Sequence, residues 1–208
     1  MATPHPISKS KLAERVLRIL NAGKITVETR VTQRDCELAV SQSRDESIVE
    51  YFAAKKSAGE TTMPFDFLVE RTITAEKKGN KHVATLPTRP LSIIGRNKSI
   101  FLVTLESDPS AEIFPTGVSH NTMFSGQPAL NMEGEMYYTP FEQEIRIYGM
   151  EADGCKLDVM YVQSGEYFTS DEFFCIAPEL QDSVVQKAIQ MLAPQMGQED
   201  RITDATGY

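Results

Sequence analysis

The chain has 208 residues, of which 41% are hydrophobic and 24% charged, and its formal net charge is −8. These totals fit one globular domain, or one domain with appendages, and the acidic balance argues against a surface devoted to holding a phosphate backbone. The start of the chain lacks the apolar run of a signal peptide, and the sequence has no stretch typical of a membrane span. We therefore expect a protein made in the cytosol that has no membrane partner.

Residues 1–60 predict a helical hairpin. Ser8 is suited to cap a helix over residues 8–22, whose apolar side chains recur on one face. Thr32, followed three residues later by Asp35, resembles a capping box and begins a second helix that runs to about Lys56. Gln42 and Asp45 interrupt the apolar stripe of this longer helix. We therefore expect the helix to pack on the first helix at one end and on another element at the other.

Basic side chains form a separate face on the first predicted helix: Lys11, Arg15 and Arg18. Charge is also uneven along the whole chain, because residues 1–34 carry seven basic and two acidic side chains, whereas residues 151–208 carry three and eleven. Two solvated faces of opposite sign would explain this. The alternative is that the basic end of one copy faces the acidic end of another, since complementary potentials favour and orient association.

Residues 61–176 predict a β body with long interaction loops. Strands are expected at residues 65–74, 82–86, 100–105, 134–139, 144–149 and 155–162, and the first two are joined by a hairpin turn at Lys77–Asn80. Residues 106–132 are rich in loop-forming residues and long for a loop in a compact domain. The hydrophobic residues within this segment favour a loop that is held by a partner.

Residues 177–194 predict a C-terminal helix that packs on the N-terminal helices, with Pro178 in its first turn and Pro194 at its end. Residues 195–208 form a polar, extended tail. The predicted fold class is therefore α+β: an antiparallel β-barrel or sandwich of about six to eight strands, flanked by an N-terminal helical hairpin and a C-terminal helix.

Residues with catalytic or ligand-binding patterns are few. Cys36, Cys155 and Cys175 show no paired spacing and are expected to be reduced thiols. His82 falls in a predicted strand, where a structural role is the simpler interpretation, and His120 beside Ser119 does not by itself set up proton transfer. Because phosphate-binding, dinucleotide and metalloprotease motifs are also missing from the sequence, we expect no enzyme, no cofactor and no metal.

The middle of the chain carries a resemblance to a known group of proteins. Its motifs are Leu86-Pro87-x-Arg89-Pro90-Leu91-Ser92, Phe114-Pro115-x-Gly117, Phe124-x-Gly126-x-Pro128-Ala129 and Glu144-Ile145-x-Ile147-Tyr148. This order of motifs resembles structural proteins of crAss-like and related tailed bacteriophages. The layout of helices, β body and helix is similar, more loosely, to the adaptor (tail-tubular) ring proteins of short-tailed phages.

The resemblance implies a subunit of a homo-oligomeric, typically dodecameric, ring in the head-to-tail connector, located in the neck or tail region of the virion. The implied partners are copies of the chain itself, the portal protein and neighbouring tail or ring proteins, with phage DNA passing transiently and without sequence-specific binding. The candidate contacts between subunits are Phe114, Val118, Met123, Phe124, Leu130 and Tyr208.

Two other functions stay open. One is a small-ligand-binding or enzymatic β-barrel with an unrecognised pocket. The other is duplex DNA binding through the face made by Lys11, Arg15 and Arg18, which would be steeply dependent on salt concentration.

Overall fold

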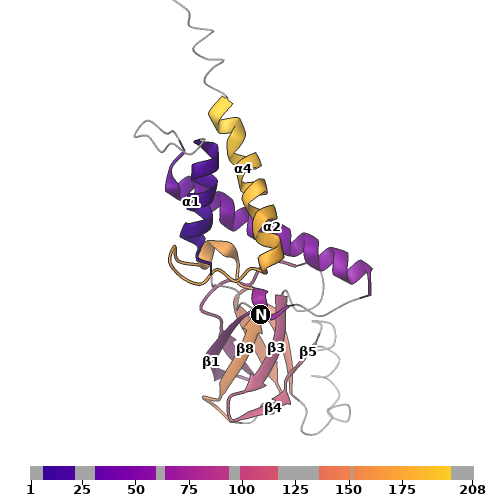
Figure 1. The fold of residues 1–208 in the computed structure, drawn as a ribbon. Coiled ribbons are helices and arrows are strands. Elements are labelled where there is room, and N and C mark those ends of the chain that lie inside the picture. The colour runs from indigo at the N-terminus through magenta and orange to yellow at the C-terminus, as the bar shows by residue number, and fades with distance from the viewer. Residues whose placement is uncertain are drawn as a thin grey trace, which may run out of the picture. The chain divides into compact units, whose positions relative to one another are not determined.

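The computed structural model describes residues 7–21, 31–59, 64–93, 99–116, 136–150 and 152–197. The chain forms two compact units (Figure 1). The helical unit comprises Met1–Phe67 and Ser164–Tyr208, and the β unit comprises Leu68–Gln163. We describe each unit by itself, within the described residues.

Three α-helices form the helical unit: α1 (Lys9–Leu20), α2 (Gln33–Ser57) and α4 (Gln181–Gly197), the last preceded by the 3-10 turn η5 (Pro178–Leu180). The predicted caps are confirmed. The Ser8 hydroxyl accepts a hydrogen bond from the Lys11 backbone, and Thr32 and Asp35 form the capping box of α2. Each cap satisfies backbone N–H groups that have no partner within the helix.

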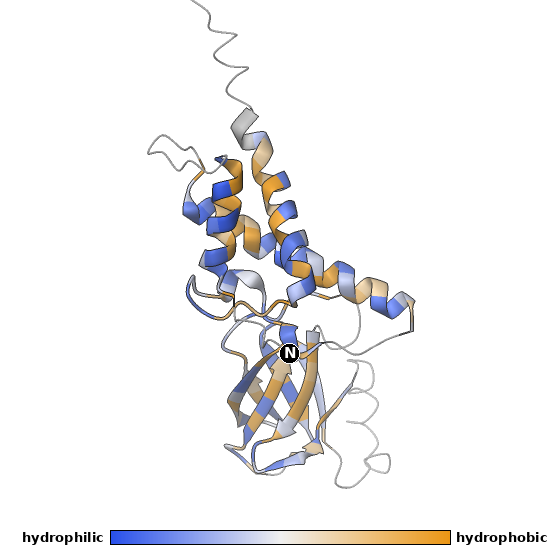
Figure 2. Ribbon diagram, in the orientation of Figure 1, coloured by the Kyte–Doolittle hydropathy of each residue, from blue (hydrophilic) through white to orange (hydrophobic). Residues whose placement is uncertain are grey.

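The three helices share one apolar core. Both α1 and α4 pack on α2 and on each other, and the orange stripes in Figure 2 mark the apolar faces that α1 and α4 bring to this core. Within α2 the last buried residue is Ile48, and beyond it the helix extends past α4 (Figure 1). Pro194 does not end α4, as predicted from the sequence, because α4 continues to Gly197. Pro194 has no N–H to donate to the preceding turn, so this part of α4 lacks one backbone hydrogen bond.

The β unit is an eight-stranded sheet. Its strands are β1 (Val69–Lys78), β2 (Lys81–Thr85), β3 (Ile100–Leu105), β4 (Asp108–Glu112), β5 (Phe114–Pro115), β6 (Tyr137–Phe141), β7 (Glu144–Tyr148) and β8 (Lys156–Tyr161). Their order is β4-β3-β8-β1-β2-β7-β6-β5. Neighbours pair antiparallel except β5 and β6, which are parallel.

The two outer strands of this order are successive parts of one stretch of chain, so the sheet is a near-closed barrel. Ile113 joins β4 to β5, and its N–H donates to the Val103 carbonyl at 2.8 Å on one side. The next N–H, of Phe114, donates to the Met136 carbonyl at 3.1 Å on the other side. Closing the sheet in this way removes the open edges that invite pairing with other chains. The predicted α+β class with a β-barrel body is confirmed.

Alternate residues of β7 and β8 are buried in the barrel interior. On β8 these are Leu157, Val159 and Tyr161, which are fully buried. Residues that are opposite each other on neighbouring strands point to the same side of a sheet. Ile147 of β7 is opposite Tyr138 of β6 on one side and His82 of β2 on the other, so these three residues also face inward. All three are buried.

The structure differs from the sequence-based boundaries in three places. Residues 65–67 form a 3-10 turn (η1, Phe65–Phe67) instead of the start of a strand, because the Phe67 ring packs edge-on against Tyr51 of α2 at 5.4 Å. Residues 108–115, predicted as loop, form β4 and β5. Residues 164–176, predicted as part of the β body, belong to the helical unit.

Candidate interaction surface

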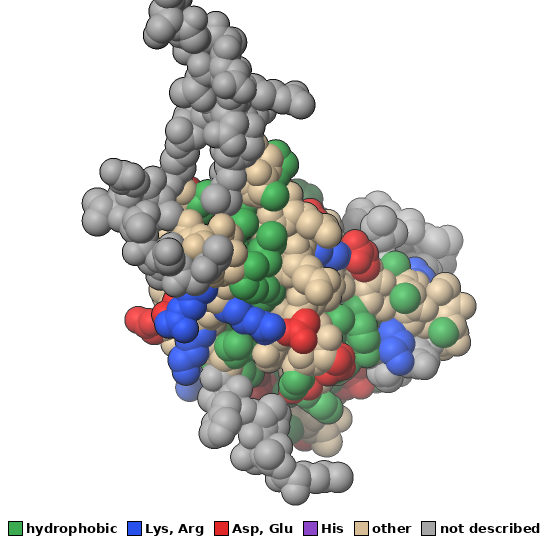
Figure 3. All heavy atoms as spheres, turned by 45° about the horizontal axis from the view of Figure 1, so that its top comes forward, with side chains coloured by type: hydrophobic (Ala, Val, Ile, Leu, Met, Phe, Trp, Pro, Cys, Tyr) green, Lys and Arg blue, Asp and Glu red, His purple; other side chains and the backbone are tan. Residues whose placement is uncertain are grey.

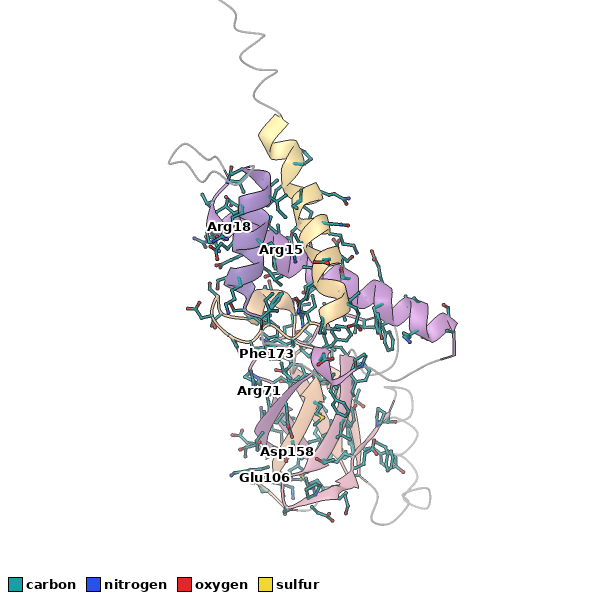
Figure 4. The ribbon with its side chains drawn as sticks, viewed as in Figure 1. Arg15, Arg18, Arg71, Glu106, Asp158 and Phe173 are labelled. Atoms are coloured by element: carbon teal, nitrogen blue, oxygen red, sulfur yellow. The ribbon has the colours of Figure 1, made fainter. Side chains whose placement is uncertain are left out.

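The three basic residues predicted to form an assembly or DNA-facing surface lie together on the exposed side of α1. Arg15 forms an ion pair with Asp182 of α4 at 2.8 Å, and Arg18 pairs with Glu14 one turn away. Figure 4 labels both arginines on α1, and Figure 3 shows acidic and basic side chains on this side of the unit. Acidic neighbours therefore offset much of the positive charge, which leaves Lys11 as the least neutralised of the three.

Of the six predicted contacts between subunits, only Phe114 lies within the described residues. Val118, Met123, Phe124, Leu130 and Tyr208 lie outside them. Phe114 is 47% exposed on β5, immediately before the segment that contains four of the other five. Phe114 is therefore the one predicted contact that the structure places.

Phe114 has aromatic neighbours on the same side of the sheet. In the strand register it is opposite Tyr137 of β6, which is opposite Tyr148 of β7. Four residues further along β6, Phe141 is 48% exposed, and the Arg146 guanidinium lies over its ring at 4.1 Å. We call these five residues, Phe114, Tyr137, Phe141, Arg146 and Tyr148, the aromatic face.

The aromatic face follows from strand periodicity. Along β6, Tyr138 is buried in the barrel, so its neighbour Tyr137 points outward. The sequence shows these aromatic residues but not their grouping, because the grouping depends on how β5, β6 and β7 pair in register. Aromatic residues and arginine are the residue types enriched at protein interfaces, and large exposed apolar side chains that gather in one place mark binding surfaces.

A second candidate site is a groove between α2 and α4, with a volume of about 320 Å³. We call it the α2–α4 groove; its lining residues are Asp35, Leu38, Ala39, Gln42, Met191 and Leu192. Leu38 is 56% exposed, although it lies on the apolar stripe of α2. Gln42, which was the sequence signal that this stripe is interrupted, lies in the groove wall. The groove is therefore mainly apolar and open to solvent.

A buried ion pair fixes residues 164–176 to α2. The Arg44 guanidinium is fully buried, with the rings of Phe168 and Phe174 at 4.9 and 5.2 Å, and its Nε donates to the Cys175 carbonyl at 2.8 Å. Its Nη1 is 2.8 Å from the Asp45 carboxylate. Every one of these contacts is an interaction between protein groups, so we assign Arg44 a structural role.

Asp45 completes this arrangement. Its carboxylate accepts hydrogen bonds from the Ser164 hydroxyl at 2.7 Å and from the Gly165 N–H at 2.9 Å. Burial raises the pKa of Asp45 and lowers the pKa of Arg44, because each charged form loses solvation in the protein interior. The pair holds Ser164 and Gly165 against α2. Asp45 is one of the two residues that interrupt the apolar stripe of this helix in the sequence, but the sequence did not predict the ion pair.

Groups suited to acid–base or metal chemistry are sparse in the described part of the chain. Among these residues there is no cluster of three or more histidine, cysteine or carboxylate side chains that could hold a metal ion. His82 is 2% exposed inside the β unit, where a substrate could not reach it. In the same residues, no helix combines the length and the apolar character needed to cross a membrane.

A comparison with protein-family models gives no match, and a comparison with curated proteins gives none either. The functional argument therefore depends on the residues described above.

Proposed function

We propose that this chain is a virion structural protein: a subunit of a homo-oligomeric ring in the head-to-tail connector of a tailed bacteriophage. The aromatic face is the observation that carries the proposal. Half-exposed Phe114 and Phe141, together with a stacked arginine, form a surface that is costly to leave in water and well suited to a protein partner. The motifs that resemble phage structural proteins lie in the same region of the chain.

The proposed ring acts by shape and contact, without turning over a substrate. DNA has to slide through a connector, and a lumen that made many phosphate contacts would hold it instead. A net charge of −8 suits such a conduit, as do the acidic partners of Arg15 and Arg18 on α1. The portal protein and neighbouring tail or ring proteins are the further partners in this proposal.

The proposal is tested by measuring self-association of the full chain at increasing concentration, using light scattering and negative-stain microscopy. We expect closed rings, and we expect the double substitution Phe114→Ser and Phe141→Ser to weaken their formation. Phe65→Ser is the matched control, because Phe65 is even more exposed but lies in the helical unit. A chain that stays monomeric at high concentration and co-purifies with a small ligand would favour a ligand-binding barrel instead.

A further inference from the structure

The aromatic face and the α2–α4 groove are different surfaces of one chain, and a ring needs two different surfaces. In a heterologous interface, one patch of a subunit contacts another patch of the next subunit, and the contact repeats until the ring closes. Building on the proposed function, we propose that the aromatic face of one copy docks in the α2–α4 groove of the next copy.

The groove provides a receptor for an apolar side chain. Its wall includes Leu38, which is more than half exposed, and Met191, which is partly exposed. A methionine side chain is flexible and polarisable, so it adapts to an aromatic ring placed against it. A volume of about 320 Å³ is at the lower end of the range for small-ligand pockets, which is enough for one or two aromatic side chains.

The aromatic face provides the matching projection. Phe141 and Phe114 are each about half exposed on a convex barrel wall, so a concave surface can cover them. The barrel is nearly closed, so its strands offer little edge for pairing with another chain. Side-chain docking is therefore the more accessible way for this wall to bind another copy.

Charge complementarity selects this pair of surfaces. Asp35 lies in the groove wall, and both of its hydrogen bonds from Thr32 in the capping box go to Oδ2, so Oδ1 can accept another. Arg146 lies in the aromatic face, and its contacts with Glu144 are long, at 3.4 Å from Nε and Nη2, and do not use Nη1. A bond from Arg146 Nη1 to Asp35 Oδ1 of the next copy would orient the contact.

The test uses two variants that each lose one half of the contact. Leu38→Glu places a charge in the groove but keeps the aromatic face, whereas the double variant Phe114→Ser and Phe141→Ser keeps the groove. Leu38, Phe114 and Phe141 are all exposed in the single chain, and circular dichroism melting curves check that both variants fold. We expect each variant alone to be monomeric where the wild-type chain assembles. An equimolar mixture should form a one-to-one dimer and stop, because only one competent pair of surfaces remains.

A double-mutant cycle tests the charge contact separately. Arg146→Ala and Asp35→Asn should each weaken association of the wild-type chain several-fold, and the double variant should be no weaker than the worse single variant. Effects of Asp35→Asn on the helix cap cancel in the cycle, since they occur with and without Arg146.

The outcomes separate this inference from the proposed function. If the wild-type chain forms rings and either half-contact variant still does so, or if the mixture stays monomeric, the docking inference is overturned while the ring proposal stands. If the mixture dimerises but the wild-type chain forms only open chains, the docking is supported and the ring proposal fails. A wild-type chain that remains monomeric at every concentration overturns both.

Discussion

Gly165 allows a close backbone approach to α2, and replacing it with alanine should destabilise the helical unit. A Cβ atom at this position would lie 2.7 Å from the Ser41 carbonyl oxygen and 3.0 Å from the Ser41 Cα. Both atoms belong to the backbone of α2, so no side-chain rotation can relieve the clash. The loop cannot move away freely either, because the Gly165 N–H donates to the buried Asp45 carboxylate at 2.9 Å.

Overpacking of this kind costs about 1–3 kcal/mol. For a unit of this size each kcal/mol lowers the melting temperature by roughly 4–8 °C. We therefore expect the helical transition of Gly165→Ala, followed by circular dichroism at 222 nm, to fall by at least roughly 4 °C. Ser41→Ala in the same chain should not restore it, since the clashing atoms remain.

Gly79→Ala is the control for this prediction. Gly79 lies in the β1–β2 turn with a φ of +70° and open space around it, so alanine there adds backbone strain in the β unit without a clash. It should leave the helical transition unchanged. If Gly165→Ala melts at the wild-type temperature, or if Ser41→Ala rescues it, the steric argument is wrong.

The remaining predictions concern the buried and capping groups. Replacing Arg44 with leucine should lower the free energy of unfolding by about 3–5 kcal/mol in urea denaturation, because it leaves the Asp45 carboxylate buried without its cation; a loss below about 1 kcal/mol would contradict this. Cys36 and Cys175 are buried, whereas Cys155 is partly exposed, and burial raises the pKa of the Cys36 thiol to about 11. A thiol reagent at pH 8 should therefore label Cys155 rapidly in the native protein, and Cys36 and Cys175 only after denaturation. Equal labelling rates would refute this. The hydrogen bond from the cap hydroxyl lowers the pKa of Asp35, so its contribution to stability is present above pH 3.8 and is lost as the pH falls through its folded-state pKa. NMR titration of the Asp35 carboxyl should give a midpoint below pH 3.8, and the substitution Thr32→Ala should return this midpoint toward 3.8.

Local features of the sequence predicted most of the elements. The caps at Ser8 and Thr32 and the hairpin between β1 and β2 depend on neighbouring residues, and all three are confirmed. One wrong prediction depends on a contact between residues that are distant in the sequence. Phe65–Phe67 alternates like a strand, but the packing of Phe67 on Tyr51 holds it as a turn.

The candidate surfaces were harder to predict than the fold. Phe114 was identified because it lies in a loop-rich, proline-containing stretch, but its grouping with Tyr137 and Tyr148 depends on the strand register. Leu38 looks like a core residue in the helical periodicity, and its exposure becomes evident only when α4 is placed beside α2. Lys11, Arg15 and Arg18 share an exposed side of α1, and their role in assembly or DNA binding stays a prediction. The pairing of Arg15 with Asp182 could not be predicted, because Asp182 is far along the chain.

The β unit is inserted into the helical unit, and its first and last strands are neighbours: Val69 of β1 pairs with Tyr161 of β8. α4 is therefore synthesised after the whole insertion, yet it has to pack on helices that preceded it. A folded insertion brings its own ends together. The entropic cost of closing a loop of roughly a hundred residues then falls to that of a loop of a few residues, which saves about 3 kcal/mol. Excised at Leu68 and Gln163, the insertion should fold alone, and a short glycine linker from Phe67 to Ser164 should let the remaining helices assemble without it.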